Sequence, residues 1–438
     1  MSTLIEQPRY SCALGATQSV IAIKRAMPIL HSGPGCGTKI NSIIGQVKGY
    51  GGANSMPCTN TSEAEVVFGG EEKLKGVIEG AFKVIDADLF VVLTGCTSDI
   101  VGDDIGSVTG VFQAQDEPVV FAETGGFKSN NYVSHDKVVI AIIDQYVDKF
   151  ANDKTTLKGL VNVFVTPPYQ DPYWDGNLEE IKRLLEGIGL TANVLFGSAS
   201  SGLEEWKTIP RAEFNIVVSA WSGLAVAEHL ERKYGTPFFH FPYLPIGGAE
   251  TTKFLNGVSE FANLEPARTA AFIQKEEKRF YAHFERLAEF LLEFKYGIPR
   301  RFYTLLDASY ALGIARYLLN ELGIIPAKQY IVDNTPEEYQ EAIKAQFARI
   351  SDFRSAEVAF SVDGGAIQEE IRRDDHKNRA LILGSSWESK LAQDIGADLL
   401  VLSVPITYRL VLTCGYAGYN GGLRLAEDIY DRVLETYR

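Results

Sequence analysis

The sequence is short of cysteine, and it has neither a long apolar run nor a signal for export. Five cysteines in 438 residues do not make a disulfide framework, so in a reducing compartment they are thiols or metal ligands. No apolar stretch approaches the roughly 18–20 residues that a membrane-spanning helix needs. The N-terminal residues lack a basic region followed by an apolar one, which a secretory signal would have. We therefore expect a cytoplasmic protein without a membrane partner.

Basic residues are also in deficit. Lysine and arginine number 42 against 56 aspartates and glutamates, which gives a formal net charge of −14 and a pI near 5.1. This balance argues against nucleic acid or an anionic membrane as the main partner. Hydrophobic residues make up 46% and charged residues 22%, ordinary globular values that exclude a disordered or collagen-like chain.

Several catalytic motifs are missing as well. The sequence has no phosphate loop of the form G-x-x-x-x-G-K followed by Ser or Thr, and no G-x-G-x-x-G between a strand and a helix. It has neither a G-x-S-x-G elbow nor an H-E-x-x-H pair. The chain therefore neither binds ATP through a known loop nor resembles a hydrolase. Asp103 and Asp104 stand at an expected helix start, where capping is the simplest role for them.

What the sequence does contain is a repeated alternation of short apolar runs and amphipathic segments. Runs of this kind, each followed by a turn and a helical pattern, are typical of buried parallel strands. The alternation predicts an α/β fold of three Rossmann-like modules with mostly parallel sheets, at residues 1–155, 156–297 and 298–438. The expected strands lie at residues 89–94, 118–122, 161–165, 214–219, 379–384 and 398–403. The expected helices lie at residues 71–84, 177–187, 224–234, 266–295, 308–322 and 335–348.

Three cysteines of the first module, Cys12, Cys36 and Cys96, stand beside glycine-containing turns. Cys36 lies in the glycine-rich segment 31–37, and Cys96 follows the strongest expected strand. In open α/β sheets, ligands bind in the crevice beyond the carboxyl ends of the strands. Glycine beside a thiol lets the backbone approach a bulky ligand and leaves N–H groups free to bond cluster sulfides. One such cysteine alone would be interpreted as a packed thiol, but three in these loops favour ligation.

The number of candidate ligands indicates whether this chain could hold a cluster alone. An iron–sulfur cluster normally has at least four protein ligands, and this module offers three. The missing ligands would then come from a second chain, so the count indicates a hetero-oligomer. Zinc bound by three cysteines and His31 is the rival interpretation, but no C-x-x-C pair supports it. Cys58 and Cys414 are interpreted as packed or half-exposed thiols, with Cys414 placed where it could line a cavity.

Four segments together resemble the nitrogenase component 1 family, and most closely its β-type chains. They are Met27–Cys36, Glu63–Gly70 with its Val-Phe-Gly-Gly turn, Thr94–Asp104 with its Ile-Val-Gly-Asp-Asp run, and Gly415–Gly422. The matches cover nearly the whole chain, from residue 10 to about residue 430. The resemblance implies the nitrogenase component 1 fold and a heterotetramer of two α-type and two β-type chains (α2β2).

The resemblance also implies a role for the cysteines. Cys12, Cys36 and Cys96 match the β-chain cysteines that hold half of a P-cluster, with the α-type chain supplying the rest; the cluster would be of the 8Fe–7S or the 4Fe–4S type. It would relay electrons from an ATP-dependent iron protein, a homodimer, to an active-site iron–sulfur cofactor in the partner chain. We then expect no catalytic residue in this chain, which is an electron-relay subunit of an oxidoreductase.

The sequence departs from molybdenum nitrogenase β chains in several places. It lacks their long N-terminal arm, it is short, and Gly126 stands where these chains often carry a serine near the P-cluster. These traits favour a nitrogenase-like branch, and the preferred interpretation is the β-type subunit of a methylthio-alkane reductase, which cleaves C–S bonds reductively. A dinitrogenase β subunit of the alternative-metal type and a cofactor-assembly scaffold are the alternatives. The protochlorophyllide and nickel-tetrapyrrole reductases share the fold but match the pattern less well.

Overall fold

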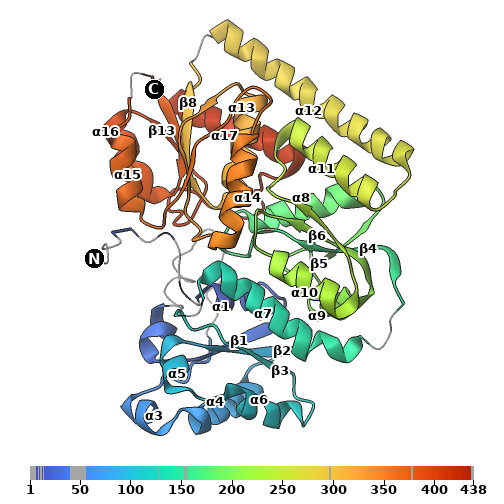
Figure 1. The fold of residues 1–438 in the computed structure, drawn as a ribbon, viewed down its shortest axis with the longest axis vertical. Helices are drawn as coiled ribbons and strands as arrows, with labels where there is room; N and C mark the ends of the chain where they lie inside the picture. The colour runs from blue at the N-terminus through green and yellow to red at the C-terminus, as the bar shows by residue number, and fades with distance from the viewer. Residues whose placement is uncertain are drawn as a thin grey trace.

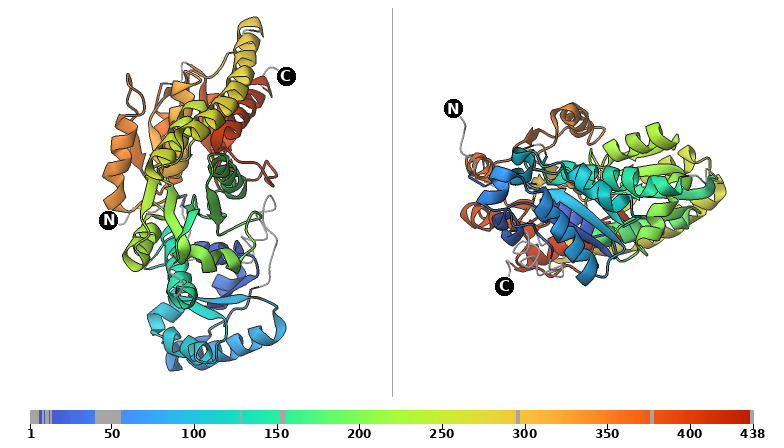
Figure 2. Two further views of the ribbon diagram at one scale, coloured as in Figure 1. Left: turned by 90° about the vertical axis from the view of Figure 1, so that its right-hand side faces the viewer. Right: turned by 90° about the horizontal axis from the view of Figure 1, so that it is seen from below.

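Three parallel β-sheets form the framework of the chain, each with helices on its faces (Figures 1 and 2). The structure is a computed structural model and describes residues 6, 7, 9, 12, 14–39, 56–127, 129–151, 155–294, 297–375 and 378–435. We call each sheet, together with the helices that connect its strands, a unit. The first unit lies at the bottom of Figure 1, and the second and third lie above it side by side.

The first unit has the strand order β1-β2-β3, with all strands parallel. Side chains alternate between the two faces of the sheet, as the two-residue period of a strand requires. Ile29, Phe90 and Val92 pack with α4 and α6 on one face, while Leu89, Val91 and Leu93 face the core shared with α1 and α7. The elements are α1 (Leu14–Ile21), β1 (Ala26–His31), α3 (Glu63–Phe68), α4 (Glu71–Val84), β2 (Leu89–Thr94), α5 (Cys96–Val101), α6 (Ile105–Gln113), β3 (Val119–Ala122), α7 (Asn131–Gln145) and the 3-10 turn Val147–Phe150.

The second unit has the strand order β5-β4-β6-β7 and is also parallel. It ends in the long helix α12, which runs along the upper edge of the molecule in Figure 1. Its elements are β4 (Leu157–Phe164), α8 (Trp174–Gly187), β5 (Thr191–Val194), α9 (Leu203–Thr208), the 3-10 turn Ile209–Arg211, β6 (Ala212–Val218), α10 (Leu224–Tyr234), β7 (Phe238–Phe241), α11 (Gly247–Phe261) and α12 (Pro266–Phe294).

The third unit has the order β11-β10-β8-β12-β13, with the short β9 paired to β8. Its last helix, α17, packs on α8, α11 and α12 of the second unit as well as on β13. Its elements are β8 (Arg301–Leu306), α13 (Ala308–Asn320), β9 (Ile325–Pro326), β10 (Gln329–Ile331), α14 (Glu337–Ala348), β11 (Val358–Phe360), α15 (Gly364–Arg372), β12 (Ala380–Gly384), the 3-10 turn Ser386–Glu388, α16 (Ser389–Ile395), β13 (Asp398–Val401) and α17 (Gly418–Glu435).

The expected α/β class with parallel sheets is confirmed, and each expected strand and helix overlaps an observed one. The module boundaries at residues 155 and 297 stay a prediction, because α17 belongs to the last module in sequence but packs largely on the second unit. Residues 152–154, which precede the predicted boundary at residue 155, lie outside the described residues.

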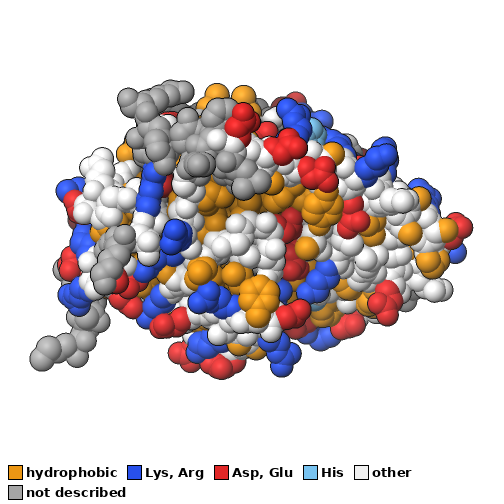
Figure 3. Space-filling view, turned by 90° about the horizontal axis from the view of Figure 1, so that it is seen from above, with side chains coloured by type: hydrophobic (Ala, Val, Ile, Leu, Met, Phe, Trp, Pro, Cys, Tyr) orange, Lys and Arg blue, Asp and Glu red, His pale blue; other side chains and the backbone are white. Residues whose placement is uncertain are grey.

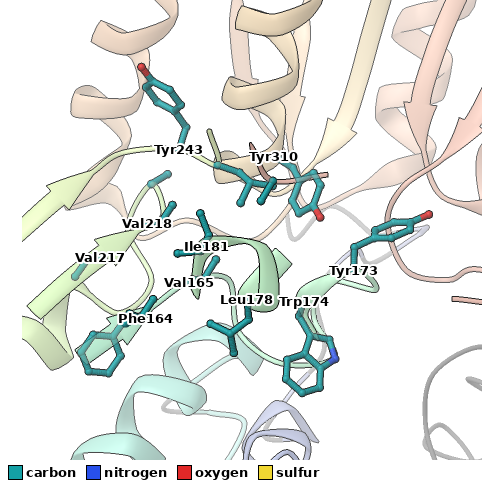
Figure 4. Packing of buried hydrophobic residues seen from close by; sticks show 14 of the residues in the cluster. Phe164, Val165, Tyr173, Trp174, Leu178, Ile181, Val217, Val218, Tyr243 and Tyr310 are labelled. Atoms are coloured by element: carbon teal, nitrogen blue, oxygen red, sulfur yellow. The ribbon is translucent and has the colours of Figure 1, made fainter. Parts of the chain in front are cut away.

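Buried polar contacts join the second and third units. The side chain of Asn177, on α8, is fully buried, and its Oδ1 accepts hydrogen bonds from the backbone N–H groups of Tyr416 at 2.7 Å and Ala417 at 2.9 Å. The hydroxyl of Tyr173 donates to the carbonyl of Val401 at 2.9 Å. Apolar side chains from β4, β6 and α8 belong to the same buried core as Tyr173 (Figure 4). The segment before α17 is thereby fixed to the start of α8.

Within the described ranges, none of the helices combines the length and the apolar character that crossing a lipid bilayer requires. Seen from the end that carries α12, basic and acidic side chains are interspersed around exposed hydrophobic ones (Figure 3). Binding to nucleic acid is favoured by a surface of uniformly positive charge, and the face in this view mixes both signs.

A buried carboxylate, Asp136, joins α7 of the first unit to the start of α10 in the second. Both of its oxygens lie near the backbone N–H of Gly223, at 3.0 and 3.1 Å. Burial raises the pKa of Asp136 to about 7, and the hydrogen bond from Gly223 opposes this shift only in part. The folded chain thus holds this proton up to about pH 7, whereas the unfolded chain releases it near pH 3.8. The contribution of Asp136 to stability therefore falls as the pH rises from about 4 to 7.

We expect Asp136→Asn to stabilise the chain relative to wild type increasingly as the pH rises from 5 to 8, by on the order of a few kcal/mol. The amide oxygen can still accept from Gly223, but the cost of a buried negative charge disappears. Urea unfolding at several pH values measures the difference. Asp104→Asn is the control, because the Ser107 hydroxyl and backbone N–H hold the pKa of Asp104 below its usual value, so this carboxylate stays ionised from pH 5 to 8 and its variant should show no pH trend there. A pH-independent effect of Asp136→Asn would contradict the assignment.

Candidate functional site

The parallel register of β1 and β2 brings two cysteine-bearing loops together. His31 at the end of β1 pairs with Thr94 at the end of β2, so residues 32–39 and α5 leave the sheet side by side. The N–H of Gly95 donates to the carbonyl of His31 at 2.9 Å, and the Ser98 hydroxyl donates to the same carbonyl at 2.7 Å. Cys96 begins α5, and Cys36 lies in the helical segment 34–39. Both cysteines therefore stand beyond the carboxyl ends of neighbouring strands, where α/β sheets bind ligands.

The two loops approach so closely that Gly95 has no room for a side chain. A Cβ at this position would lie 2.0 Å from the Ser32 Oγ and 2.5 Å from the Ser32 Cβ. Contacts this short require the backbone to move, because the Ser32 Cβ is fixed to the main chain. Glycine at position 95 is thus needed for the position of Cys96.

Cys12 and Cys96 meet at Gly126. A Cβ on Gly126 would lie 3.2 Å from the Cys12 Cβ and 3.2 Å from the Cys96 Sγ. The loop after β3 therefore lies close to both cysteines, and a side chain at position 126 would crowd them. The structure thus places Gly126 beside two of the three predicted ligands.

Cys36 has Cys58 as its neighbour. A Cβ on Gly37 would lie 3.1 Å from the Cys58 Sγ. Backbone hydrogen bonds of residues 57 and 59 with Leu30 place Cys58 along the outer edge of β1. Burial raises the pKa of the Cys58 thiol, and the nearby Cys36 adds to this shift. Cys58 is half-exposed, as expected, but its place beside Cys36 could not be read from the sequence.

His31 is not positioned as a metal ligand. Its side chain is fully buried, with Nδ1 3.1 Å from the Thr59 hydroxyl and Nε2 2.8 Å from the Asp103 Oδ2. Burial lowers the pKa of His31, although the hydrogen bond with Asp103 opposes this effect. Both ring nitrogens are therefore engaged, and the structure does not support the rival zinc site with His31.

The two aspartates after α5 have different roles. Asp104 caps α6, since its Oδ1 accepts from the Ser107 N–H at 2.9 Å, so capping was the right interpretation for this residue. Asp103 instead binds His31 and also accepts from the N–H of Gly70 at 2.8 Å. It thereby fixes the glycine turn between α3 and α4 to the end of β1. The long sequence separation of these partners left no local signal for this contact.

Cys414 lies in a different part of the chain, before α17. Its Sγ accepts a hydrogen bond from Arg409 at 3.4 Å, and burial raises the pKa of the thiol. It lines a cavity of about 710 Å³ whose other polar walls include Glu180, Arg183 and Arg424. The expectation that Cys414 is half-exposed and faces a cavity is confirmed.

The cysteine-bearing face also exposes large apolar side chains. Phe127 follows Gly126 and is 74% exposed, Ile100 on α5 is 70% exposed, and Phe68 at the end of α3 is 88% exposed. Helices α3 and α5 pack against each other, and Gly126, next to Phe127, lies beside Cys96 at the start of α5, so these side chains belong to one region. Cys12 and Cys36 are exposed in the same region, whereas free cysteines are usually buried.

Comparison with known proteins decides the family. The family model described as nitrogenase component 1 type oxidoreductase matches residues 11–434. The chain belongs to this family. The nitrogenase molybdenum-iron protein beta chain of Methanococcus maripaludis is 25% identical, over 99% of this chain and 96% of that protein. A light-independent protochlorophyllide reductase subunit of Leptolyngbya boryana is 24% identical, over 80% of this chain and 69% of that protein.

A solved structure supports the nitrogenase component 1 fold. The structure titled "Nitrogenase Cp1 at pH 6.5" superimposes with a TM-score of 0.80 at 20% identity, and the match covers all of this chain and 95% of that one. The predicted family and fold are therefore confirmed, and the chain is similar over its whole length to nitrogenase β chains. The ligand roles of Cys12, Cys36 and Cys96 stay a prediction.

The residues present fit an iron–sulfur cluster better than a single metal ion. Within the part of the chain that the structure describes, no three His, Cys, Asp or Glu side chains are close enough to hold one ion. Cluster ligands stand further apart, because each thiolate binds a different iron. Gly126 lies beside the Cys12 Cβ and the Cys96 thiol, and the Ser32 and Thr61 hydroxyls are buried near these loops without a hydrogen-bond partner in the described structure. Thiolates beside glycine loops are a suitable donor set for such a group.

We expect Gly95→Ala to lower the free energy of unfolding by about 1–3 kcal/mol, because its methyl group would overlap Ser32. Gly110→Ala in α6 is the matched control, since a Cβ at position 110 meets no atom within 4 Å. There the same change should stabilise by about 0.5–1 kcal/mol through helix propensity. Urea unfolding measures both changes. Equal stability of the two variants would show that the close approach at Gly95 does not exist.

Proposed function

We propose that this chain is the β-type subunit of a nitrogenase-like reductase and that it relays electrons without itself cleaving a substrate bond. Cys12, Cys36 and Cys96 hold half of an interface iron–sulfur cluster of the P-cluster type, and an α-type partner supplies the remaining ligands. The complex is a cytoplasmic α2β2 heterotetramer, and an ATP-dependent iron protein homodimer reduces it. The observation that carries the proposal is the face on which these cysteines lie.

That face has the character of a protein interface. Exposed thiols and exposed Phe68, Ile100 and Phe127 are costly on a surface that stays in water, and apolar clusters of this kind mark sites of association. The named relatives are nitrogenase β chains and a protochlorophyllide reductase subunit, and these names mark them as parts of larger assemblies. A partner chain on this face would bury the apolar side chains and complete the ligand set.

Each part of the site has a separate task in this proposal. The cluster, when bound, supplies electron transfer at a low potential. The thiolates bind iron, and Gly95 and Gly126 let the main chain approach it. The His31–Asp103 contact holds the end of β1 in place, and the surrounding apolar side chains exclude water, which tunes the potential.

The proposed substrate class is a methylthio-alkane, reduced at the cofactor of the partner chain. The C–S bond of the thioether takes up two electrons and two protons and gives methanethiol and a hydrocarbon. Gly126 supports a branch distinct from molybdenum nitrogenase, because it has no hydroxyl beside Cys12 and Cys96 that could ligate an oxidised cluster. A dinitrogenase β subunit and an assembly scaffold are the competing outcomes of the test.

We expect anaerobic co-purification to yield a second chain of similar size, with about eight irons per pair of chains in addition to any cofactor. Iron and acid-labile sulfide analysis and EPR in the reduced and oxidised states measure this. Turnover of a thioether would support the reductase, and turnover of dinitrogen would instead support the dinitrogenase. A cluster-loaded complex that reduces neither substrate and transfers its cofactor would identify a scaffold. An iron-free monomer would contradict the proposal.

We expect Cys96→Ala to lower the reductase activity of the complex by at least about tenfold, because one cluster ligand is lost. The fold and the assembly should persist, as judged by circular dichroism and gel filtration. Cys414→Ala is the control, because that thiol lies in the cavity beside Arg409 and not among the proposed ligands. Full activity of Cys96→Ala would contradict the relay role.

A further inference from the structure

The segment that carries Cys12 is attached to the third unit, although Cys12 itself lies against the first. The N–H of Arg9 donates to the carbonyl of Val362 at 3.1 Å, and the N–H of Gly364 donates to the carbonyl of Gln7 at 2.9 Å. Residues 7 and 9 therefore lie beside the beginning of α15, while α1 lies in the first unit (Figure 1).

A buried ion pair fixes this attachment. The side chains of Arg9 and Glu388 are 2% and 0% exposed. One guanidinium nitrogen of Arg9 lies 3.1 Å from the Glu388 Oε2 and 2.9 Å from the Ser385 Oγ, and the other bonds the Glu388 Oε1. Bidentate hydrogen bonds between an arginine and a carboxylate are strong and directional. Arg9 also lies over the ring of Trp387, 4.9 Å from its centre.

The third unit forms a shaped receptor for Arg9. Glu388 accepts further hydrogen bonds from the Ser385 N–H at 2.7 Å and from the Gln368 amide at 3.1 Å. A Cβ on Gly364 would lie 2.1 Å from the Arg9 Nε, so this glycine makes the room for the guanidinium. A buried charge with these partners would be left unpaired if Arg9 moved away, which would be strongly unfavourable.

Cys12 is held between this anchor and the first unit. Only two residues separate it from Arg9, and a chain extends at most about 3.6 Å per residue, so the anchor limits its position to within roughly 10 Å. On the other side, the N–H of Gly15 donates to the carbonyl of Cys12 at 3.3 Å. A Cβ on Gly15 would lie 2.4 Å from the carbonyl oxygen of Asn131, so α1 is packed tightly on α7.

We propose that the Arg9–Glu388 pair is a positioning device that holds Cys12 beside Cys96 and Gly126. The inference rests on the proposed function for the role of the cluster. Cys36 and Cys96 follow strands of the first sheet and are placed by its register. Cys12 precedes α1, and the third unit holds its position through Arg9. Glu388 and Arg9 thus act through Cys12 and are not themselves ligands.

The test compares iron retention in the co-purified complex. We expect Glu388→Gln, which keeps the shape but removes the charge, to release iron to an iron(II) chelator about tenfold faster than wild type and to alter the EPR signal of the cluster. Arg9→Lys keeps the charge, so its rate of iron release should lie between the rates of wild type and Glu388→Gln. Glu250→Gln is the matched control, because it breaks another buried pair, with Arg316 at 3.5 Å, that has no connection to Cys12.

A second readout does not depend on the cluster. In the iron-free complex, dibromobimane bridges close thiols, and peptide mass spectrometry locates the bridge. We expect a Cys12–Cys96 bridge in wild type and in Glu250→Gln, and a yield about tenfold lower in Glu388→Gln. The inference would be overturned if Glu388→Gln formed the bridge and retained iron as well as wild type does. It would also be overturned if Glu250→Gln lost as much bridging and iron as Glu388→Gln. If the wild-type complex holds no iron, the proposed function fails, and the bridging yields alone decide the role of the anchor.

Discussion

The in-register parallel pairing of β1 with β2 is the constraint on which the cysteine-bearing face depends. It sets the end of β1 at His31 level with the end of β2 at Thr94, so the loops that follow must cross at Ser32 and Gly95. A shift of one residue would turn the alternating side chains of β1 to the opposite face of the sheet, away from α4 and α6. The cores on the two faces therefore fix the register, and the register fixes the loops. The site thus depends on the packing of the whole first unit.

The same geometry places exposed apolar side chains on the cysteine-bearing face of the single chain. Beyond the carboxyl ends of β1 and β2 lie thiols, glycines and exposed apolar side chains. Phe68, Ile100 and Phe127 project from this region. A surface of this composition gains free energy when another protein covers it. A shared site at an interface is consistent with this need.

The sequence predicts most of the fold because the strands are buried on both faces. Leu89–Thr94 and Glu71–Val84 match the observed β2 and α4, since continuous apolar runs and a clear helical period leave little ambiguity. β1 was not among the expected strands, because Pro28 interrupts its short apolar run; as an edge strand of the sheet it tolerates proline. The site was predicted less completely. The glycine-flanked cysteines were visible, whereas the contacts of Asp103 with His31 and of Cys58 with Cys36 arise only when distant segments meet.

The three cysteines consequently differ in what holds them. Local geometry fixes the positions of Cys36 and Cys96, since each lies within a few residues of a buried strand. Cys12 precedes the first helix, and its place depends on an ion pair between residues 379 positions apart in the sequence. Contacts of such separation form only after the third unit has folded, because closing so long a loop costs entropy that local contacts do not repay. The folded third unit is therefore a condition for placing Cys12 beside Cys96, which couples completion of the site to completion of the chain.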